Sequence, residues 1–189
     1  RLPDVSSGYV RRFLDDELSD ALRVHPAVLV VGPRASGKTT TARRYAATVV
    51  RLDRPAEAAA VIADADAALA TLEEPVLLDE WQTVPGLLGA VKRAVDDDSR
   101  PGRFILTGSV RADLEGETWP GTGRLVRLDM WGLAEREIAG STEVSSPLSV
   151  VAEHGAAALS APPSPPDLPG YIELALRGGF PDAALRLED

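Results

Sequence analysis

The segment AVLVVGPRASGKTT, residues 27–40, decides the fold of this chain of 189 residues. It opens with a continuous apolar run over residues 27–31, of the kind that forms a central strand buried on both faces of a parallel sheet. Residues 32–39 then satisfy the pattern G-x-x-x-x-G-K-S/T, and a helix is predicted from Lys38 to about Thr48. A strand, a glycine-rich turn and a helix in this order predict a phosphate-binding loop within an α/β fold.

The residue types in this loop suit a nucleotide. Small residues let successive main-chain N–H groups converge on phosphate oxygens, and the start of the helix adds partial positive charge. We expect Lys38 to reach the β and γ phosphates of ATP and to act in catalysis. Thr39 is expected to place its hydroxyl on Mg²⁺, which prefers oxygen ligands. The residues predicted to bind the nucleotide are Gly32, Pro33, Arg34, Ala35, Ser36, Gly37, Lys38, Thr39 and Thr40.

A second apolar strand, predicted over residues 75–78, ends in the acidic pair Asp79-Glu80. Asp79 is expected to hold Mg²⁺ through water or through the hydroxyl of Thr39. Glu80 is expected to orient and deprotonate the attacking water. An acidic pair at a strand end is also typical of a helix N-cap or of plain surface, so the pair indicates catalysis only together with the phosphate loop.

A further strand, predicted over residues 103–107, ends in the hydroxyl-bearing sequence Thr107-Gly108-Ser109. Either Thr107 or Ser109 is expected to hydrogen-bond the γ-phosphate or the lytic water, and Ser109 is the preferred candidate. A turn that satisfies its own backbone is the alternative. Gln82 follows the acidic pair closely enough to sense the same water.

Arginine supplies most of the positive charge, since Lys38 and Lys92 are the only lysines among the 20 basic residues. Charge that develops on a transferred phosphoryl group usually requires an arginine from the same chain or from a neighbour. Arg124 is our candidate for this catalytic role, although an ordinary surface arginine is the alternative. The pairs Arg11-Arg12 and Arg43-Arg44 are interpreted as solvated helix faces.

The alternation of elements predicts a three-layer α/β parallel sheet, with ligands at the carboxyl ends of the strands. The remaining predicted helices cover residues 9–24, 55–72, 87–95 and 171–176, and the remaining strands residues 49–52 and 124–129. Residues 145–149 and 161–170 lack core periodicity and are interpreted as linker or exposed loop. We expect a helical segment at 1–24 that packs on the core, a P-loop ATPase core at 25–141, and at 142–189 an irregular tail that begins a truncated C-terminal region.

Composition excludes several classes of protein. No apolar run approaches the roughly eighteen residues of a membrane span, so we expect a cytoplasmic protein without a membrane partner. Cysteine is absent, which removes disulfides and thiolate metal sites. The net charge of −9 does not indicate nucleic-acid binding by this chain, although a full-length protein could still bind it.

Together these motifs resemble those of the bacterial and archaeal AAA-superfamily ATPases that carry a C-terminal domain of unknown function (domain of unknown function 4143). The residues that match the family are Tyr9 and Arg12, Gly32-Pro33-Arg34 with Gly37-Lys38-Thr39, Leu78-Asp79-Glu80-Trp81-Gln82, Ile105-Leu106-Thr107-Gly108-Ser109, Gly123-Arg124 with Leu133 and Arg136-Glu137, and Gly178-Gly179-Phe180-Pro181. The chain departs from the family at Trp81, where an aliphatic residue is usual. It departs again at Gly132, Ala134 and Glu135, where proline, serine and phenylalanine are expected.

This resemblance implies an ASCE-type P-loop NTPase sheet, in which the strand of Thr107 lies between the phosphate-loop strand and the strand of Asp79. It also implies Mg-dependent ATP hydrolysis and a larger C-terminal domain beyond this chain. Hydrolysis would then drive a conformational change of that domain, and the protein could form a homo-oligomer in which a neighbour supplies an arginine.

Two other functions remain open from the sequence. The chain could be a nucleotide-binding switch or interaction module with little turnover, or a P-loop phosphotransferase that passes the γ-phosphate to a small molecule. Glu80 beside Asp79 favours water as the acceptor. A GTPase is disfavoured, because a chain without asparagine has no N-K-x-D guanine signature.

Overall fold

The computed structural model describes residues 9–109, 123–141, 146–159 and 164–186. These residues divide into two compact units. The larger unit runs from Arg12 to Gly132, and the smaller unit joins residues 9–11 to the described residues after 132. None of the helices in these ranges combines the length and the apolar character that crossing a membrane requires.

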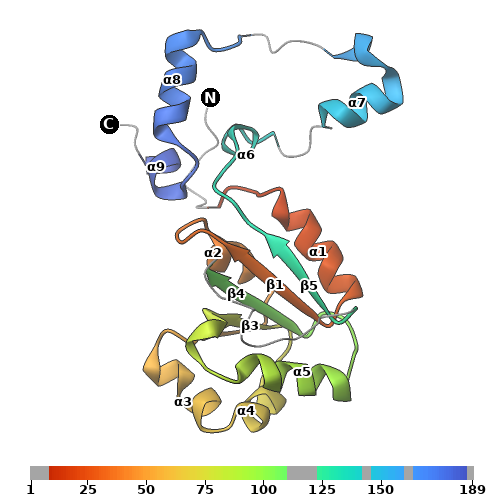
Figure 1. Cartoon of the computed structure of the whole chain (residues 1–189), viewed down its shortest axis with the longest axis vertical. Coiled ribbons are helices and arrows are strands. Elements are labelled where there is room, and N and C mark those ends of the chain that lie inside the picture. The colour runs from red at the N-terminus through yellow and green to blue at the C-terminus, as the bar shows by residue number, and fades with distance from the viewer. Residues whose placement is uncertain (1–8, 110–122, 142–145, 160–163, 187–189) are drawn as a thin grey trace. The chain divides into compact units, whose positions relative to one another are not determined.

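The larger unit is built on a sheet of five parallel strands in the order β2-β3-β4-β1-β5 (Figure 1). The strands are β1 (Ala27–Gly32), β2 (Thr48–Arg51), β3 (Val76–Asp79), β4 (Phe104–Ser109) and β5 (Leu125–Asp129). Strand β4, which carries Thr107, lies between β1 and β3. The observed order confirms the predicted α/β fold class and the expected ASCE arrangement.

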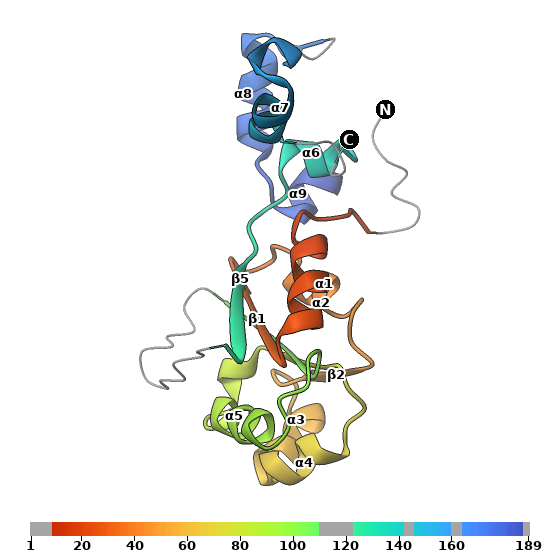
Figure 2. The same cartoon turned by 90° about the vertical axis from the view of Figure 1, so that its right-hand side faces the viewer.

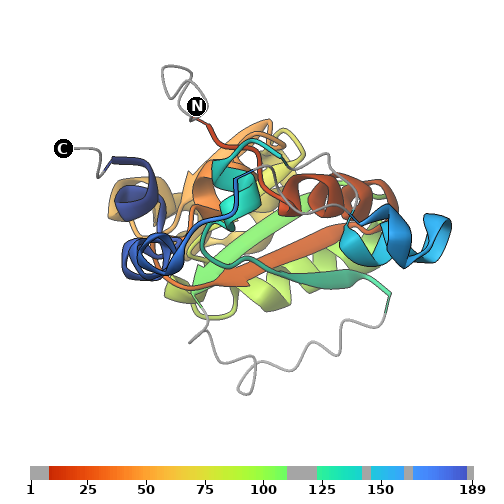
Figure 3. The same ribbon diagram turned by 90° about the horizontal axis from the view of Figure 1, so that it is seen from above.

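Helices cover both faces of this sheet, because successive side chains of the apolar strands point to opposite sides. Val28 and Val30 pack with helices α1 (Leu14–Val24) and α2 (Lys38–Ala42). Leu29 and Val31 belong to the cluster formed with α3 (Pro55–Ala63), α4 (Ala65–Thr71) and α5 (Leu87–Asp97). Figure 3 shows α1 in red and α5 in yellow-green on opposite faces, and Figure 2 shows β5 running beside β1.

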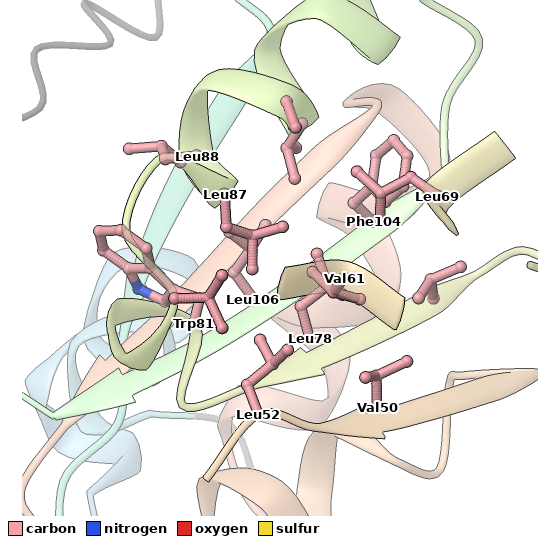
Figure 4. Close-up of a cluster of buried hydrophobic side chains, with 14 of the residues drawn as sticks. Val50, Leu52, Val61, Leu69, Leu78, Trp81, Leu87, Leu88, Phe104 and Leu106 are labelled. Carbon is pink, nitrogen blue, oxygen red and sulfur yellow. The ribbon is translucent and has the colours of Figure 1, made fainter. Parts of the chain in front are cut away.

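The core on the α5 side includes the residue that follows the acidic pair. Trp81 is 4% exposed and lies among Leu52, Leu87 and Leu106 (Figure 4). Burying a large apolar side chain stabilises a fold by roughly 1.5–3 kcal/mol. The indole therefore anchors the turn after β3, which explains how an aromatic residue replaces the usual aliphatic one here.

Two predicted helices differ from the observed ones. The helix that follows the phosphate loop ends at Ala42, because the main chain at Ala47 and Thr48 turns to donate hydrogen bonds to the carbonyl of Pro75. The alanine-rich stretch at 55–72 forms two helices rather than one. Asp64 is extended between them, and its carboxylate accepts from the N–H of Ala67 as the N-cap of α4.

The smaller unit is helical, with α6 (Glu135–Ile138), α7 (Pro147–His154), α8 (Leu168–Arg177) and α9 (Pro181–Arg186). Leu133, Ile138 and Ala184 form its buried cluster. The prediction of linker was wrong where α7 and α8 begin, because Ser146 and Asp167 cap their first turns with side-chain hydrogen bonds. Part of the predicted loop, residues 161–163, lies outside the described residues.

A tyrosine in the segment after α2 contacts α1, and its effect on stability depends on pH. The hydroxyl of Tyr45 lies 3.0 Å from both the carbonyl and the carboxylate Oδ1 of Asp15. Burial and this contact with Asp15 raise the pKa of Tyr45 to about 12. Since the ordinary pKa of tyrosine is about 10, the contribution of Tyr45 to the free energy of unfolding is fully present below pH 10. It is lost as the pH rises through 12.

Replacing Tyr45 by phenylalanine should lower the free energy of unfolding by about 1 kcal/mol at pH 7, because one hydrogen bond is lost. The advantage of wild type should shrink and disappear as the pH rises from about 10 to about 12. Urea denaturation across this pH range checks both effects, with the exposed Tyr171→Phe as control. A difference that persists unchanged above pH 12 would contradict this role of Tyr45.

Candidate functional site

The parallel pairing brings the predicted functional residues to one edge of the sheet. Gly32, which ends β1, is opposite Ser109, which ends β4. Asp79, which ends β3, is opposite Thr107 of β4. The carboxyl ends of three neighbouring strands therefore meet beside the glycine-rich loop that follows β1.

The phosphate loop adopts a conformation that favours an anion. Ala35 and Gly37 both have positive φ values, of 62° and 98°. Left-handed residues in such a turn bring successive main-chain N–H groups to one side, where they form a concavity for an anion. Because α2 has only five residues, most of the positive potential comes from these N–H groups and from Lys38.

Lys38 is folded over this loop. Its ammonium nitrogen donates to the carbonyl oxygens of Gly32, at 3.1 Å, and of Pro33, at 2.8 Å. An ammonium group has three donors, so one donor remains for a phosphate oxygen. Burial lowers the pKa of Lys38, and the negative charges of Glu80 and Asp79 oppose that effect. Both carboxylates are thus close enough to act electrostatically on the lysine.

Asp79 joins the loop to the strands. Its Oδ1 atom accepts hydrogen bonds from the hydroxyl of Thr39, at 2.7 Å, and from the hydroxyl of Thr107, at 2.5 Å. Asp79 is only 7% exposed and Thr107 is fully buried. Thr107 thus contacts the carboxylate of Asp79. Ser109, which the sequence favoured over Thr107 as the group that contacts the γ-phosphate or the lytic water, stays a prediction. Ser109 is half-buried at the tip of the strand beside Gly32.

Glu80 begins a tight turn in the left-handed conformation, with φ 58° and ψ 48°. The main-chain N–H and the hydroxyl of Thr83 both reach the carbonyl of Glu80, at 3.0 and 2.8 Å. The half-buried Glu80 carboxylate accepts a hydrogen bond from the amide of Gln82 at 2.5 Å. The turn holds this carboxylate beside Asp79 at the loop edge of the sheet.

The other predicted binding residues follow the course of the loop. Ser36 is fully buried, and in the described part of the chain its hydroxyl has no hydrogen-bond partner. Gly32 is confined by the residue after β5, because a Cβ atom there would lie 1.9 Å from the carbonyl oxygen of Met130. Arg34, Ala35 and Thr40 are exposed, and Pro33 is half-buried.

Arg12 is a residue whose position the sequence did not predict. The interpretation of Arg11-Arg12 as a solvated pair is wrong for Arg12, which is 5% exposed, whereas Arg11 is exposed. The Arg12 guanidinium donates to the carbonyls of Ser36 and Trp131, both at 2.8 Å. These two carbonyls accept from the fork of donors, which favours burial of this arginine against the phosphate loop.

Arg124 lies away from the phosphate loop. This corrects the expectation that Arg124 acts on a nucleotide bound to its own chain. It comes immediately before β5, and its carbonyl accepts from the N–H of Ala27, at the start of β1. The phosphate loop follows the opposite end of β1. The exposed side chain of Arg124 forms an ion pair with Asp96 at the end of α5. Arg124 therefore does not reach the phosphate loop of its own chain.

A parallel sheet with β4 between β1 and β3, a glycine-lysine loop after β1 and an acidic residue at the tip of β3 define a P-loop NTPase fold. The chain belongs to the AAA domain family, whose match covers residues 24–139. It is thus a nucleotide-binding, ATPase-like domain.

The chain is 33% identical over 135 residues to two curated relatives, the uncharacterized protein Rv2008c of Mycobacterium tuberculosis and the uncharacterized protein Mb2031c of Mycobacterium bovis. In both cases the alignment covers 69% of this chain and 31% of the relative. The chain thus matches about a third of the length of these proteins.

The close approach of Met130 predicts that Gly32 is needed for a stable fold as well as for ligand binding. Gly32→Ala should lower the free energy of unfolding by about 2–3 kcal/mol, because its Cβ would collide with backbone. Gly89→Ala is the matched control. Its Cβ would meet only the end of the Arg93 side chain, at 3.5 Å, and alanine in a helix is favoured by about 0.5–1 kcal/mol. Urea denaturation measures both, and a Gly32→Ala variant as stable as wild type would contradict the packing argument.

Proposed function

We propose that this chain binds Mg-ATP at the loop Gly32–Thr40 and hydrolyses it with Glu80 as general base. One observation carries the proposal. The carboxylate of Asp79 is hydrogen-bonded to Thr39 of the phosphate loop, while Glu80, the next residue, carries a second carboxylate at the same edge. A phosphate-binding element and a pair of acids meet at one place, as phosphoryl transfer to water requires.

Binding would rest mainly on the main chain of the loop. The N–H groups that Ala35 and Gly37 turn to one side suit phosphate oxygens, and the third donor of Lys38 suits an oxygen of the β or γ phosphate. The buried hydroxyl of Ser36 lies in the same loop. In the larger unit these groups carry positive potential at an otherwise acidic edge, and this favours an anionic ligand.

The donor atoms also fit Mg²⁺. The hydroxyl of Thr39 and the Oδ1 atom of Asp79, 2.7 Å apart, are both hard oxygen ligands. Mg²⁺ takes few protein ligands in such sites and completes its shell with phosphate oxygens and water. When bound, Mg²⁺ neutralises charge on the phosphates.

Glu80 is the group proposed to activate water. The water oxygen forms a bond to the γ-phosphorus, the bond to the β–γ bridging oxygen breaks, and the proton of the water passes to the Glu80 carboxylate. Asp79 is less suited to this task, because its Oδ1 atom already accepts two hydroxyl hydrogen bonds. Lys38 would stabilise negative charge on the transferred phosphoryl group.

In a longer protein, hydrolysis would serve to reposition an attached C-terminal domain. The two relatives are themselves longer than the aligned region, which covers 31% of their length. An arginine for the transferred phosphoryl group would come from another subunit of a homo-oligomer. Arg124 is suited to that arrangement, because it is exposed at the amino ends of the strands.

Lys38→Ala should weaken Mg-ATP binding by at least about tenfold, because charge-assisted hydrogen bonds contribute roughly 1.5–3 kcal/mol. Isothermal titration calorimetry measures the loss. Lys92→Ala is the matched control, since this only other lysine forms an ion pair with Asp96 on α5 and should leave the affinity unchanged. Unchanged affinity in the Lys38 variant would remove the phosphate-loop assignment.

Glu80→Gln should keep Mg-ATP affinity within about threefold and slow phosphate release by about 100-fold or more, because a general base contributes that much. Glu73→Gln, at an exposed position before β3, should behave as wild type. Steady-state phosphate release, measured beside calorimetry, separates the two effects. Full turnover by the Glu80 variant would show that another group activates water, and binding without turnover by wild type would favour a nucleotide switch.

A further inference from the structure

The residue that contacts the Glu80 carboxylate has no part in the hydrolysis proposed above. Gln82 donates a hydrogen bond from its amide nitrogen to Oε2 of Glu80 at 2.5 Å. The two residues are separated by Trp81, whose indole is fixed in the core. The amide of Gln82 is thus attached to a rigid part of the turn and holds the one carboxylate proposed to act on water.

The main chain of the turn is fixed independently of this bond. Glu80 has the left-handed backbone conformation. This conformation is unfavourable in free energy for a residue that has a side chain, and it persists only where neighbouring groups enforce it. Thr83 enforces it through two hydrogen bonds to the Glu80 carbonyl. The hydrogen bonds of Thr83 do not fix the rotamer of the Glu80 side chain. The hydrogen bond from Gln82 selects that rotamer.

The other side of the Gln82 amide is packed against β4. A Cβ atom on Gly108 would lie 2.8 Å from Oε1 of Gln82 and 2.9 Å from the indole nitrogen of Trp81. The absence of a side chain at Gly108 therefore makes room for the amide. Enclosed between the β4 backbone and the Glu80 carboxylate, the amide cannot swing away without leaving one of them.

Stability does not explain this glutamine. Within the described part of the chain, Oε1 of Gln82 and the indole nitrogen of Trp81 are buried and have no hydrogen-bond partner. A buried acceptor without a partner destabilises the fold, so an apolar side chain of the same shape would be tolerated at this position. The hydrogen bond to Glu80 is what an apolar replacement would remove.

We infer that Gln82 is a positioning residue that sets the orientation of the Glu80 carboxylate toward the attacking water, with Gly108 providing the space for its amide. The inference rests on the proposed hydrolysis by Glu80. It assigns to Gln82 an effect on the rate of the chemical step, with no part in holding the nucleotide.

The test is a double-mutant cycle on the chain with Gln82→Met, Glu80→Gln and both changes together. Methionine keeps the length of the side chain and removes its donor. Gln82→Met should lower kcat for phosphate release by about 10- to 100-fold, the effect of a small misplacement of a reacting group. KM for ATP should stay within about twofold, and the melting temperature should fall by no more than about 4 °C. In the Glu80→Gln background the same change should have no further effect on kcat, because the two residues act as a unit.

Thr71→Val, which removes an exposed hydrogen bond on α4, serves as the control and should leave kcat unchanged. The inference is overturned if Gln82→Met has the kcat of wild type, or if it lowers kcat equally in both backgrounds, since Gln82 would then act without Glu80. A drop in kcat that accompanies a large loss of melting temperature would assign Gln82 a structural role instead. Full activity of Glu80→Gln alone would contradict the assignment of Glu80 as the base, and Gln82 would then have no base to position. This outcome distinguishes failure of the proposed function from failure of the inference about Gln82.

Discussion

The arrangement of the site depends on the buried carboxylate of Asp79. One of its oxygens accepts hydroxyl hydrogen bonds from Thr39, which begins α2 with Lys38, and from Thr107 of the neighbouring strand β4. These bonds connect the phosphate loop, β3 and β4 at a single atom. A buried carboxylate is tolerated when it is hydrogen-bonded, so both hydroxyls stabilise Asp79 in the fold.

Small residues allow these parts to approach one another. Gly32 has no room for a side chain next to Met130, and Gly108 has none next to Gln82 and Trp81. Both glycines lie at the carboxyl ends of central strands, where the main chain itself forms the wall of the site. The proposed nucleotide-binding edge is therefore built from backbone, with Lys38, Asp79 and Glu80 as its charged groups.

The sequence predicted those features that arise from local patterns. Apolar runs predicted the strands, and the glycine-lysine motif predicted the loop, because both depend on residues that are neighbours in the chain. The burial of Arg12 depends on tertiary contacts, and the bond from Gln82 to Glu80 depends on the left-handed turn at Glu80. Periodicity carries neither. The end of α2 was missed for the same reason, since it is set by pairing with the segment before β3. The position of Arg124 did have a signal: a residue just before a parallel strand lies at the edge opposite to one that follows a strand.

The central claim is that the loop after β1 recognises a chain of phosphates with the help of Mg²⁺. Calorimetric titration of the unmodified chain with ATP, ADP and AMP, each with and without Mg²⁺, tests it most directly. The account predicts that ATP and ADP bind, that Mg²⁺ strengthens ATP binding, and that AMP binds more weakly by about 100-fold or more, because it lacks the phosphates that Lys38 and the loop contact. Equal affinity for AMP and ATP, or no response to Mg²⁺, would contradict it.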